Sequence, residues 1–263
     1  MGTVISLANQ KGGVAKTTTS ANLGAGLALH GQKTLLIDFD PQGSLTQFFG
    51  VDKQPDFKTV GDWVLDRKPF NEVVQKTPFE RLDIVPAGEQ LKSDELDMEK
   101  DRLRALKFLQ RKVEQIQDQY DFILIDTLPS FSLLFLNSLV AADYVLVPTK
   151  LEFLSMRGLT LLFSRVRDIQ QEVKPIKILG VVGTFYRTGV KESEACLAEL
   201  KQTLPNHVLA AVIHLNSKLS ESASYAKPIQ HYDRSSQGYL DYENLTKEVL
   251  EKCRVKQPLV AAH

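Results

Sequence analysis

The chain has few of the features that mark zinc, disulfide-rich or membrane proteins. Its 263 residues include two cysteines, Cys196 and Cys253, which lie far apart and form no Cys-x-x-Cys pair. This argues against a zinc or iron–sulfur site within one chain and is typical of a protein from the reducing cytoplasm. No apolar run reaches the roughly 18 residues of a membrane-spanning helix. Because the formal net charge is zero, a nucleic-acid partner would need a local basic patch.

The composition is that of a soluble globular protein, with 43% hydrophobic and 24% charged residues. A chain of this length can form one α/β domain with a large core. The sequence contains no repeat, no low-complexity segment and no evident linker. We therefore expect a single domain over residues 1–263, with a disordered tail from about residue 255 to residue 263.

Short apolar runs alternate with helical stretches along the chain. The predicted strands cover residues 4–8, 34–40, 82–88, 122–126, 144–149, 176–183 and 208–213. Residues 17–30 have the length and spacing of a helix, and residues 94–119 form a charged stretch of helical period. Because short buried strands that alternate with helices build a sheet covered on both faces, we predict an α/β fold with a mostly parallel central sheet.

A Gly-rich segment, QKGGVAKTTT at residues 10–19, lies between the first predicted strand and the first predicted helix. The strict phosphate-binding loop, G-x-x-x-x-G-K-[ST], would have glycines where this chain has Gln10 and Ala15. The strict loop also has no requirement for the extra Lys11. The segment is either a Gly-rich turn beside a solvated lysine or a variant phosphate loop.

The chemistry of the segment favours the phosphate loop. Gly12 and Gly13 let the backbone turn tightly and direct its N–H groups at phosphate oxygens, next to the positive end of the following helix. Lys16 can reach the β- and γ-phosphates, and the Thr17 hydroxyl can bind Mg²⁺. Ala15 is the smallest side chain after glycine, so the phosphates can still approach. The sequence therefore predicts a P-loop site for a nucleoside triphosphate with Mg²⁺.

Charged residues stand where several predicted strands end. Asp38 and Asp40 end the second strand, and Asp126 ends the fourth. Lys150 directly follows the fifth strand. Ligands of open parallel sheets bind outside the carboxyl ends of the strands, so we expect these side chains to gather around the phosphate loop.

These motifs resemble those of the ParA/MinD family of deviant Walker ATPases. KGGVAKT (11–17) fits the family loop K-G-G-x-x-K-[ST], DFDPQGS (38–44) is similar to D-x-D-P-Q-G-N, and IDTLPS (125–130) is similar to I-D-x-P-P-S. Segments 147–159 and 218–250 look like the ParA branch. The resemblance covers nearly the whole chain and implies a P-loop NTPase fold, ATP hydrolysis and the cofactors ATP and Mg²⁺.

The resemblance also implies roles for the charged residues. Lys16 contacts the phosphates of its own nucleotide, whereas Lys11 crosses an ATP-sandwiched homodimer to the partner's phosphates and offsets charge on the transferred phosphoryl group. Asp40 orients or activates the attacking water. Asp126 holds Mg²⁺ through a water, and Asp38 braces the loop. The implied catalytic residues are Lys11, Lys16 and Asp40, and the implied metal set is Thr17, Asp40 and Asp126.

Two segments depart from the family pattern. Leu128 replaces the first proline of the usual pair after Asp126, in the loop that relays hydrolysis. The segment that closes over the base, often I-P-R-N, reads IHLN at residues 213–216, which would leave backbone contacts to adenine possible. The implied nucleotide-binding residues are Lys11, Gly12, Gly13, Val14, Ala15, Lys16, Thr17, Thr18, Asp126, Lys150, Ile213, His214 and Asn216.

The ParA branch implies non-specific DNA binding by the ATP dimer. The matching basic positions, with plausible neighbours, are Arg187, Lys218, Lys227 and Arg234. With so few residues before the first strand, we expect no helix-turn-helix extension and no sequence-specific operator binding. The implied partner is a ParB-like or cargo-adaptor protein that stimulates hydrolysis, and the implied location is the nucleoid in the cytoplasm.

Lys150 and Arg157 stand where ParA proteins commonly have Gln and Glu. This basic pattern resembles that of ParA-type ATPases that position carboxysomes, so a carboxysome is an alternative to a plasmid or chromosome as cargo. We expect Lys150 to make a contact across the dimer. A MinD-like membrane switch and a ligase-type metabolic enzyme are the alternative functions. The C-terminal segment contains Pro258 and no sustained apolar face, so no membrane anchoring is expected.

Overall fold

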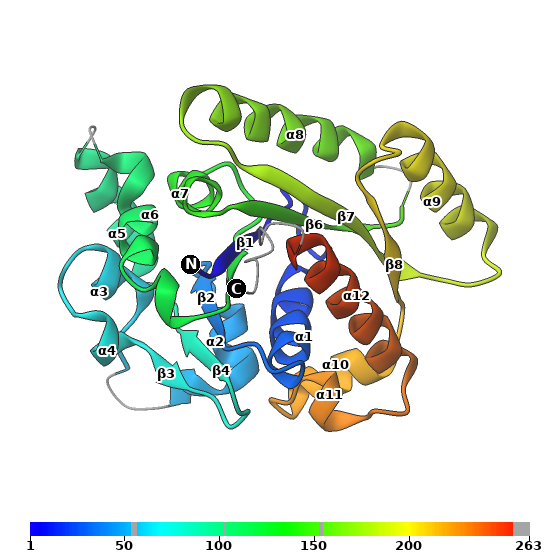
Figure 1. Cartoon of the computed structure of the whole chain (residues 1–263), viewed down its shortest axis with the longest axis horizontal. Helices are drawn as coiled ribbons and strands as arrows, with labels where there is room; N and C mark the ends of the chain where they lie inside the picture. The colour runs from blue at the N-terminus through cyan, green and yellow to red at the C-terminus, as the bar shows by residue number, and fades with distance from the viewer. Residues whose placement is uncertain (54–56, 102–103, 153–154, 255–263) are drawn as a thin grey trace, which may run out of the picture.

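The computed structural model describes residues 1–53, 57–101, 104–152 and 155–254. A single eight-stranded sheet crosses the molecule in the order β3-β4-β2-β5-β1-β6-β7-β8 (Figure 1). The strands are β1 (Thr3–Leu7), β2 (Thr34–Phe39), β3 (Gln75–Lys76), β4 (Leu82–Val85), β5 (Phe122–Thr127), β6 (Tyr144–Lys150), β7 (Lys177–Tyr186) and β8 (Val208–His214). All neighbouring pairs are parallel except β3 with β4. The predicted fold class is confirmed, and the short edge strand β3 was not foreseen.

The longer helices cover the two faces of this sheet. They are α1 (Lys16–Leu29), α5 (Leu91–Lys100), α6 (Phe108–Glu114), α7 (Leu133–Ala141), α8 (Ser155–Glu172), α9 (Lys191–Thr203), α10 (Ser217–Ser224) and α12 (Gln237–Arg254). Short helices are α2 (Ser44–Phe49), α3 (Val60–Val64), α4 (Phe70–Val73) and α11 (Ile229–Tyr232), with 3₁₀ turns η1 (Val51–Lys53), η2 (Ala105–Lys107) and η3 (Gln117–Gln119). Among the described residues, no helix has the length and apolar character of a membrane span.

Alternating side chains of the central strands pack into two apolar layers, one on each face of the sheet. In β2, Leu35 and Ile37 join the layer that includes α7 and α8, whereas Leu36 joins the layer that includes α1 and α12. In Figure 1, α8 lies above the sheet, and α1 and α12 lie below it. Because both faces are covered, all six residues of β2 and of β5 are buried.

The charged stretch 94–119, predicted to be helical throughout, is broken into several pieces. α5 ends at Lys100, and η2, α6 and η3 follow it. Asn137 of α7 stabilises this break, because its Nδ2 donates to the Ala105 carbonyl (2.7 Å) and its Oδ1 accepts from the Leu109 N–H (3.3 Å). A helical period in the sequence could not reveal a break held by a residue about 30 positions further along. The tail predicted to be disordered, 255–263, lies outside the described residues.

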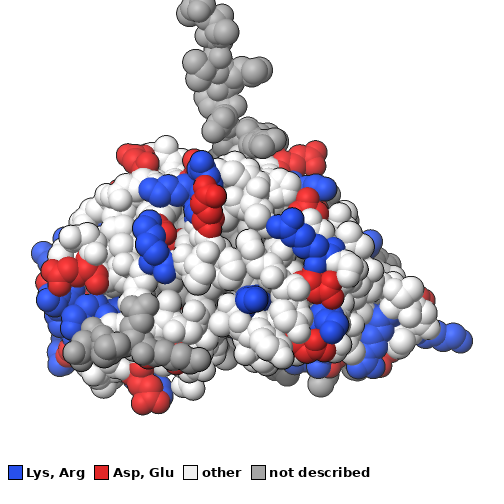
Figure 2. Space-filling model, turned by 90° about the horizontal axis from the view of Figure 1, so that it is seen from below, with Lys and Arg blue, Asp and Glu red and all other residues white. Residues whose placement is uncertain are grey.

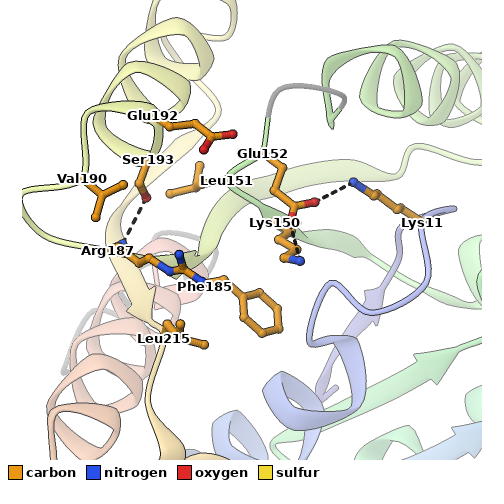
Figure 3. Close-up of a pocket in the computed structure, with 10 residues that line it drawn as sticks. All are labelled: Lys11, Lys150, Leu151, Glu152, Phe185, Arg187, Val190, Glu192, Ser193 and Leu215. Carbon is orange, nitrogen blue, oxygen red and sulfur yellow. Dashed lines mark hydrogen bonds and ion pairs between the residues drawn. The ribbon is translucent and has the colours of Figure 1, made fainter.

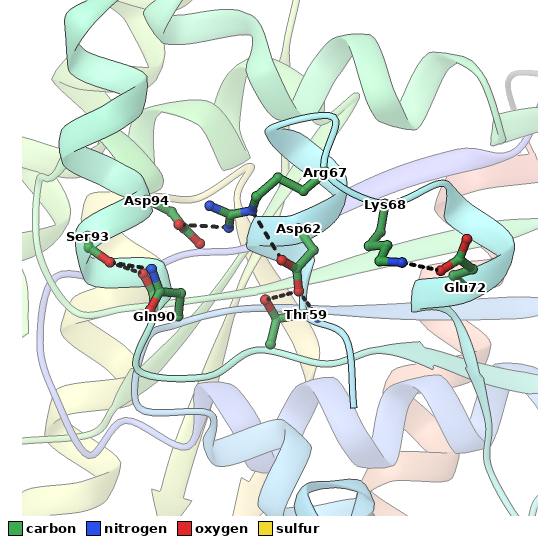
Figure 4. A network of polar contacts seen from close by, with 8 residues as sticks. All are labelled: Thr59, Asp62, Arg67, Lys68, Glu72, Gln90, Ser93 and Asp94. Atoms are coloured by element: carbon green, nitrogen blue, oxygen red, sulfur yellow. Dashed lines mark hydrogen bonds and ion pairs between the residues drawn. The ribbon is translucent and has the colours of Figure 1, made fainter. Parts of the chain in front are cut away.

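A polar network joins α3 to α5 at the edge of the molecule (Figure 4). The Arg67 guanidinium donates to Asp62 on α3 (3.1 Å) and to Asp94 on α5 (2.8 Å). Asp94 is fully buried, and a Cβ at Gly61 would lie 1.8 Å from its Oδ2. Helix α3 can therefore approach α5 only because Gly61 has no side chain, and Arg67 compensates the buried charge of Asp94.

The packing of α1 on α12 yields a stability prediction. A Cβ at Gly26 would lie 2.2 Å from the Thr246 Oγ1 and 3.2 Å from its Cβ. Thr246 is buried, and its hydroxyl donates to the Tyr242 carbonyl at 2.6 Å. Overpacking costs of about 1–3 kcal/mol should exceed the gain of about 1 kcal/mol in helix propensity. We expect Gly26→Ala to lower the unfolding free energy by about 1 kcal/mol, measured by urea denaturation.

The matched control is Gly26→Ala made in a Thr246→Ala background, where the clashing hydroxyl and methyl are gone. There the glycine substitution should be neutral or stabilising. Equal destabilisation in the two backgrounds would show that Thr246 does not limit this contact.

Candidate nucleotide-binding site

The loop between β1 and α1 is held in a tightly turned conformation. Asn9 anchors it, since its Nδ2 donates to the Pro148 carbonyl (2.8 Å) and its Oδ1 accepts from the Lys11 N–H (3.0 Å). Gly13 and Ala15 have φ angles of 67° and 66°. A positive φ is unfavourable for alanine, so this backbone shape is imposed by the surrounding contacts. The predicted variant loop therefore turns as a phosphate loop must.

The turned loop has open space beside its two glycines. A Cβ at Gly13 would meet no atom within 4 Å, and one at Gly12 would meet only the Pro129 side chain at 4.0 Å. Val14 is buried, and its carbonyl accepts a hydrogen bond from the Thr184 hydroxyl (3.2 Å), which fixes the loop to β7. The N–H groups in the first turn of α1 have no partners within the helix and favour an anion.

Lys16 lies at the start of α1 with only 7% of its surface exposed. Its Nζ donates to the Lys11 carbonyl at 3.3 Å. Burial lowers the pKa of Lys16, and the negative charges of Asp126 and Asp40 partly oppose that shift. A phosphate bound in the loop would add further negative charge beside the ammonium and stabilise its charged form.

Asp126, at the end of β5, is linked to the first turns of α1. Its Oδ2 accepts from the Thr17 hydroxyl (2.8 Å), and its Oδ1 accepts from the Ser20 hydroxyl (2.8 Å). Burial raises the pKa of Asp126 to about 6, although the two hydroxyl donors and Lys16 oppose the shift. Thr18, also in the first turn, is half-buried, and its carbonyl accepts from the Asn22 amide (2.7 Å).

Asp38 and Asp40 stand beside Asp126 with different surroundings. Asp38 is directly opposite Asp126 in the β2–β5 register and is fully buried. It accepts from the Thr46 N–H (2.8 Å), the Thr46 hydroxyl (2.7 Å) and the Asp40 N–H (3.2 Å), so it braces the loop that carries Asp40. Burial, and then the charge of Asp126, raise the pKa of Asp38 to about 7. Asp40 is only half-buried, so its carboxylate is accessible to solvent. Its Oδ1 accepts from the Gln42 N–H (2.9 Å).

A cavity of about 580 Å³ opens beside the loop (Figure 3). It is lined by Lys11, Lys150, Leu151, Glu152, Phe185, Arg187, Val190, Glu192, Ser193 and Leu215. Glu152 lies between two lysines, with Oε2 3.2 Å from the Lys11 Nζ and Oε1 paired with the Lys150 Nζ. The structure thus brings Lys11 and Lys150 together, but on one carboxylate that the sequence reasoning had not considered.

The residues predicted to contact the base lie at and after the end of β8. Ile213 is buried, so its side chain faces the core. His214 is held by Asp241 of α12, which accepts from its Nδ1 (2.9 Å) and its backbone N–H (2.7 Å). Asn216 caps α10, since its Oδ1 accepts from the Lys218 N–H (2.8 Å). These contacts fix the segment in place and leave the Asn216 amide nitrogen able to donate.

The residues predicted to contact DNA lie in two places, one at the cavity and the other around α10 and α11. Arg187 follows β7 and lines the cavity with Lys11, as Figure 3 shows. Lys218, on α10, forms an ion pair with Glu221 (2.7 Å), whereas Lys227 and Arg234 are exposed beyond α10 and α11. On the face in Figure 2, Lys and Arg side chains are interspersed with Asp and Glu. On that face, one chain has no broad basic surface.

Four further residues shape the site and were missed from the sequence. Ser20 binds Asp126, Asn9 anchors the loop, Thr184 ties the loop to β7, and Glu152 pairs with both lysines. Ser20 could have been found, because it follows Lys16 and Thr17 by one helical turn and shares their face of the helix. Asn9 belongs to the loop itself, but its partner Pro148 is on β6. Thr184 of β7 and Glu152 after β6 reach the loop from far along the chain, and no local pattern indicates these contacts.

The described residues fit a magnesium–nucleotide complex. The open loop and the first turn of α1 would hold phosphates together with Lys16, and the Thr17 hydroxyl retains lone pairs for a cation. Asp126 can accept from a water in the cation's shell. A divalent cation would also compensate Asp38 and Asp126, which are neighbouring buried carboxylates with raised pKa values.

The pKa of Asp38 predicts a pH dependence of stability. Without nucleotide, the unfolded chain ionises Asp38 near pH 4, but the folded chain keeps the proton up to about pH 7. As the pH rises through this window the unfolded state releases the proton first, so the folded state loses stability. Relative to Asp38→Asn, the parent should lose on the order of a few kcal/mol, since each pKa unit corresponds to about 1.4 kcal/mol.

Urea denaturation of both proteins at several pH values between 4 and 8 measures this difference. The hydrogen bonds that the substitution disturbs contribute about equally at every pH, so the trend with pH isolates the ionisation. A constant difference across the range would contradict the assignment.

Comparisons with known proteins agree with this geometry. Residues 2–178 match the family described as "AAA domain". The Soj sporulation initiation inhibitor of Bacillus subtilis is 38% identical over 250 residues, which is 95% of this chain and 98% of that protein. The chromosome-partitioning ATPase Soj of Treponema pallidum is 37% identical, over 96% and 98% of the two chains.

A solved structure extends the likeness to bound cofactors. Cobyrinic acid a,c-diamide synthase from Mycobacterium smegmatis, crystallised with an ATP analogue and magnesium, is 31% identical with a TM-score of 0.85, and each chain is covered completely. The prediction of ATP and Mg²⁺ as cofactors is thereby confirmed. With its phosphate loop, its strand-end carboxylates and these relatives, the chain belongs to the ParA/MinD family of ATPases, together with the Soj chromosome-partitioning proteins.

Proposed function

We propose that this ATPase forms a dimer around two ATP molecules, binds nucleoid DNA without sequence preference and positions or segregates a cargo. The observation that carries the proposal is the orientation of its two loop lysines. Lys16 is buried at its own loop, whereas Lys11 points to the surface cavity and pairs with Glu152. A loop lysine that is 39% exposed and directed outward can reach the phosphates of a second protomer.

The hydrolytic step follows from the same residues. Lys16 and the first-turn N–H groups of α1 hold the phosphates, while Thr17, oriented by Asp126, takes a position in the Mg²⁺ shell. The bound Mg²⁺ would neutralise charge on the phosphates. Asp40 is accessible and beside the loop, so it orients the attacking water, and Lys11 of the partner offsets charge on the transferred group.

Non-specific DNA binding follows as a property of the dimer. Arg187 lines the cavity and Lys218 is already paired with Glu221 on α10, so one protomer offers few phosphate contacts. Two protomers double these contacts. Because affinity depends on counterion release, doubling the contacts raises affinity steeply at low salt. ATP-controlled dimerisation would then control the residence of the protein on the nucleoid.

The cargo is a plasmid, a chromosome or a carboxysome, and a ParB-like or adaptor protein bound to it stimulates hydrolysis. The Treponema relative is named a chromosome-partitioning ATPase, which supports a DNA cargo, that is, a chromosome or a plasmid. Stimulated hydrolysis in one protomer separates the dimer and releases DNA near the cargo. A partner that accelerates a slow ATPase converts this release into directed movement.

A diamide synthase is the second candidate, because the Mycobacterium smegmatis chain of 31% identity carries that name. The two functions differ in what stimulates ATP consumption. Phosphate release that requires cobyrinic acid and an amide donor would favour the synthase. Stimulation by DNA together with an adaptor protein would favour partition.

The first functional prediction separates nucleotide binding from hydrolysis. Lys16→Ala should abolish ATP binding, because the loop then lacks its buried cation. Asp40→Ala should bind ATP as the parent does and cleave it roughly 100-fold or more slowly. Binding is measured with a fluorescent ATP analogue and cleavage by phosphate release. If both variants lose binding equally, the roles assigned to these residues are wrong.

The second functional prediction concerns DNA. Binding should appear with a non-hydrolysable ATP analogue and be absent with ADP, as measured by anisotropy with unrelated DNA duplexes. Lys218→Glu should weaken it and reduce the salt slope by about two, one contact for each protomer. Its matched control, Glu221→Gln, frees Lys218 from its ion pair (2.7 Å) and should strengthen binding.

Neither substitution should alter ATP hydrolysis measured without DNA, because Lys218 and Glu221 pair with each other on α10 and neither side chain takes part in the contacts that hold the phosphate loop. Equal affinity in ADP, or a preference for one duplex, would overturn the DNA proposal.

A further inference from the structure

One carboxylate pairs with two lysines that line the cavity. Glu152 has one oxygen on the Lys11 Nζ at 3.2 Å and the other paired with the Lys150 Nζ (Figure 3). Both lysines hold the pKa of Glu152 below its usual value, with Lys150 contributing more than Lys11. In this structure, therefore, the lysine proposed to act across the dimer is bound within its own chain.

Lys150 is held in place more firmly than Lys11. It ends β6, where its register partner is Thr184 of β7. Its Nζ also lies 5.2 Å from the centre of the Phe185 ring, a cation–π contact. Lys11, by contrast, belongs to a loop, although the two side chains are similarly exposed, at 39% for Lys11 and 33% for Lys150. Of the two partners of Glu152, Lys11 is the one proposed to move to the phosphates of the second protomer. Lys150 remains at the end of β6.

The charges show why this difference matters for dimerisation. When Lys11 moves to the partner's phosphates it leaves Glu152 behind. A carboxylate left without a cation would face the incoming triphosphate and repel it. Lys150 prevents that repulsion, because it remains paired with Glu152 after Lys11 has left.

We propose that Lys150 is a positioning residue that acts through Glu152: it keeps this carboxylate neutralised and so releases Lys11 to the second protomer. Glu152 holds Lys11 until that protomer's nucleotide arrives. This inference rests on the ATP-dependent dimer of the proposed function. It differs from the expectation that Lys150 itself touches the partner or its nucleotide, and a double-substitution cycle separates the two.

The experiment compares the parent, Lys150→Gln, Glu152→Gln and the double variant. Each is mixed with Mg²⁺ and AMP-PNP, and its dimer dissociation constant is measured by sedimentation at about 0.15 M salt, where charges more than about 8 Å apart are largely screened. Monomer melting temperatures and AMP-PNP affinities are recorded as checks that fold and loop are intact.

We expect Lys150→Gln to weaken the dimer and Glu152→Gln to strengthen it, each by roughly twofold to twentyfold. The range follows because a dimer releases two such lysines and an exposed ion pair changes an equilibrium by a factor of roughly 1.5 to 5. In the Glu152→Gln background, Lys150→Gln should change the constant less than about twofold. Lys150→Arg, which keeps a cation beside Glu152, should restore dimerisation to near the parental value.

Three results would overturn the proposal. Equal weakening by Lys150→Gln in both backgrounds would show that Lys150 contacts the partner directly. An unchanged dimer dissociation constant in both single variants would show that Glu152 does not hold Lys11 before the dimer forms. A Lys150→Arg variant as weak as Lys150→Gln would exclude a role of charge.

The proposed function has a separate readout in the same series. If the parent stays monomeric with AMP-PNP although it binds the analogue, the dimer itself is wrong. If the parent dimerises and Lys11→Ala does not, the dimer and the trans role of Lys11 stand. The comparison of the Lys150 and Glu152 single and double variants then decides the part played by Lys150.

Discussion

The contact between Asp126 and the first turns of α1 is the interaction on which the rest of the site depends. One carboxylate at the end of β5 binds Thr17 and Ser20, both at 2.8 Å, and so sets how α1 meets the sheet. The loop before α1 must then turn back through Gly13 and Ala15 at positive φ. The positions of Lys16, of the open phosphate cradle and of Lys11 follow from this junction.

That junction places carboxylates together in the protein interior. Asp38 and Asp126 are opposite each other on adjacent strands, and both have pKa values raised mainly by burial. Lys16 is buried beside them, with its pKa lowered. Burial makes the ionised forms of all three side chains unfavourable. Bound Mg²⁺ and phosphates would supply compensating charges, so ligand binding and the stability of the site are coupled.

The outer part of the site follows a different electrostatic rule. Lys11, Lys150 and Glu152 are each between 33% and 42% exposed, so solvent screens their interactions and each ion pair is weak. Weak pairs can exchange partners. A buried pair at this position would hold Lys11 permanently, whereas an exposed one can give it up to a phosphate of a second protomer. Lys218 and Glu221 at the proposed DNA surface form a pair of the same exposed kind.

Much of the fold and the inner site could be predicted from local sequence patterns. The predicted strands, the turned loop before α1 and the carboxylates at strand ends all depend on residues close together in the chain, where backbone geometry links pattern to structure. The break after Lys100 could not be predicted in this way, because Asn137 of another helix stabilises it.

Pairing between distant residues was decided by the tertiary structure. His214 is bound by Asp241 of α12, and Lys11 by Glu152 beyond β6. The sequence by itself determined that Lys11 and Lys150 lie at the carboxyl edge of the sheet, since Lys11 is in the loop that follows β1 and Lys150 ends β6. Only the folded chain decided that one carboxylate pairs with both, because electrostatic pairing depends on distance in space and not on separation along the sequence.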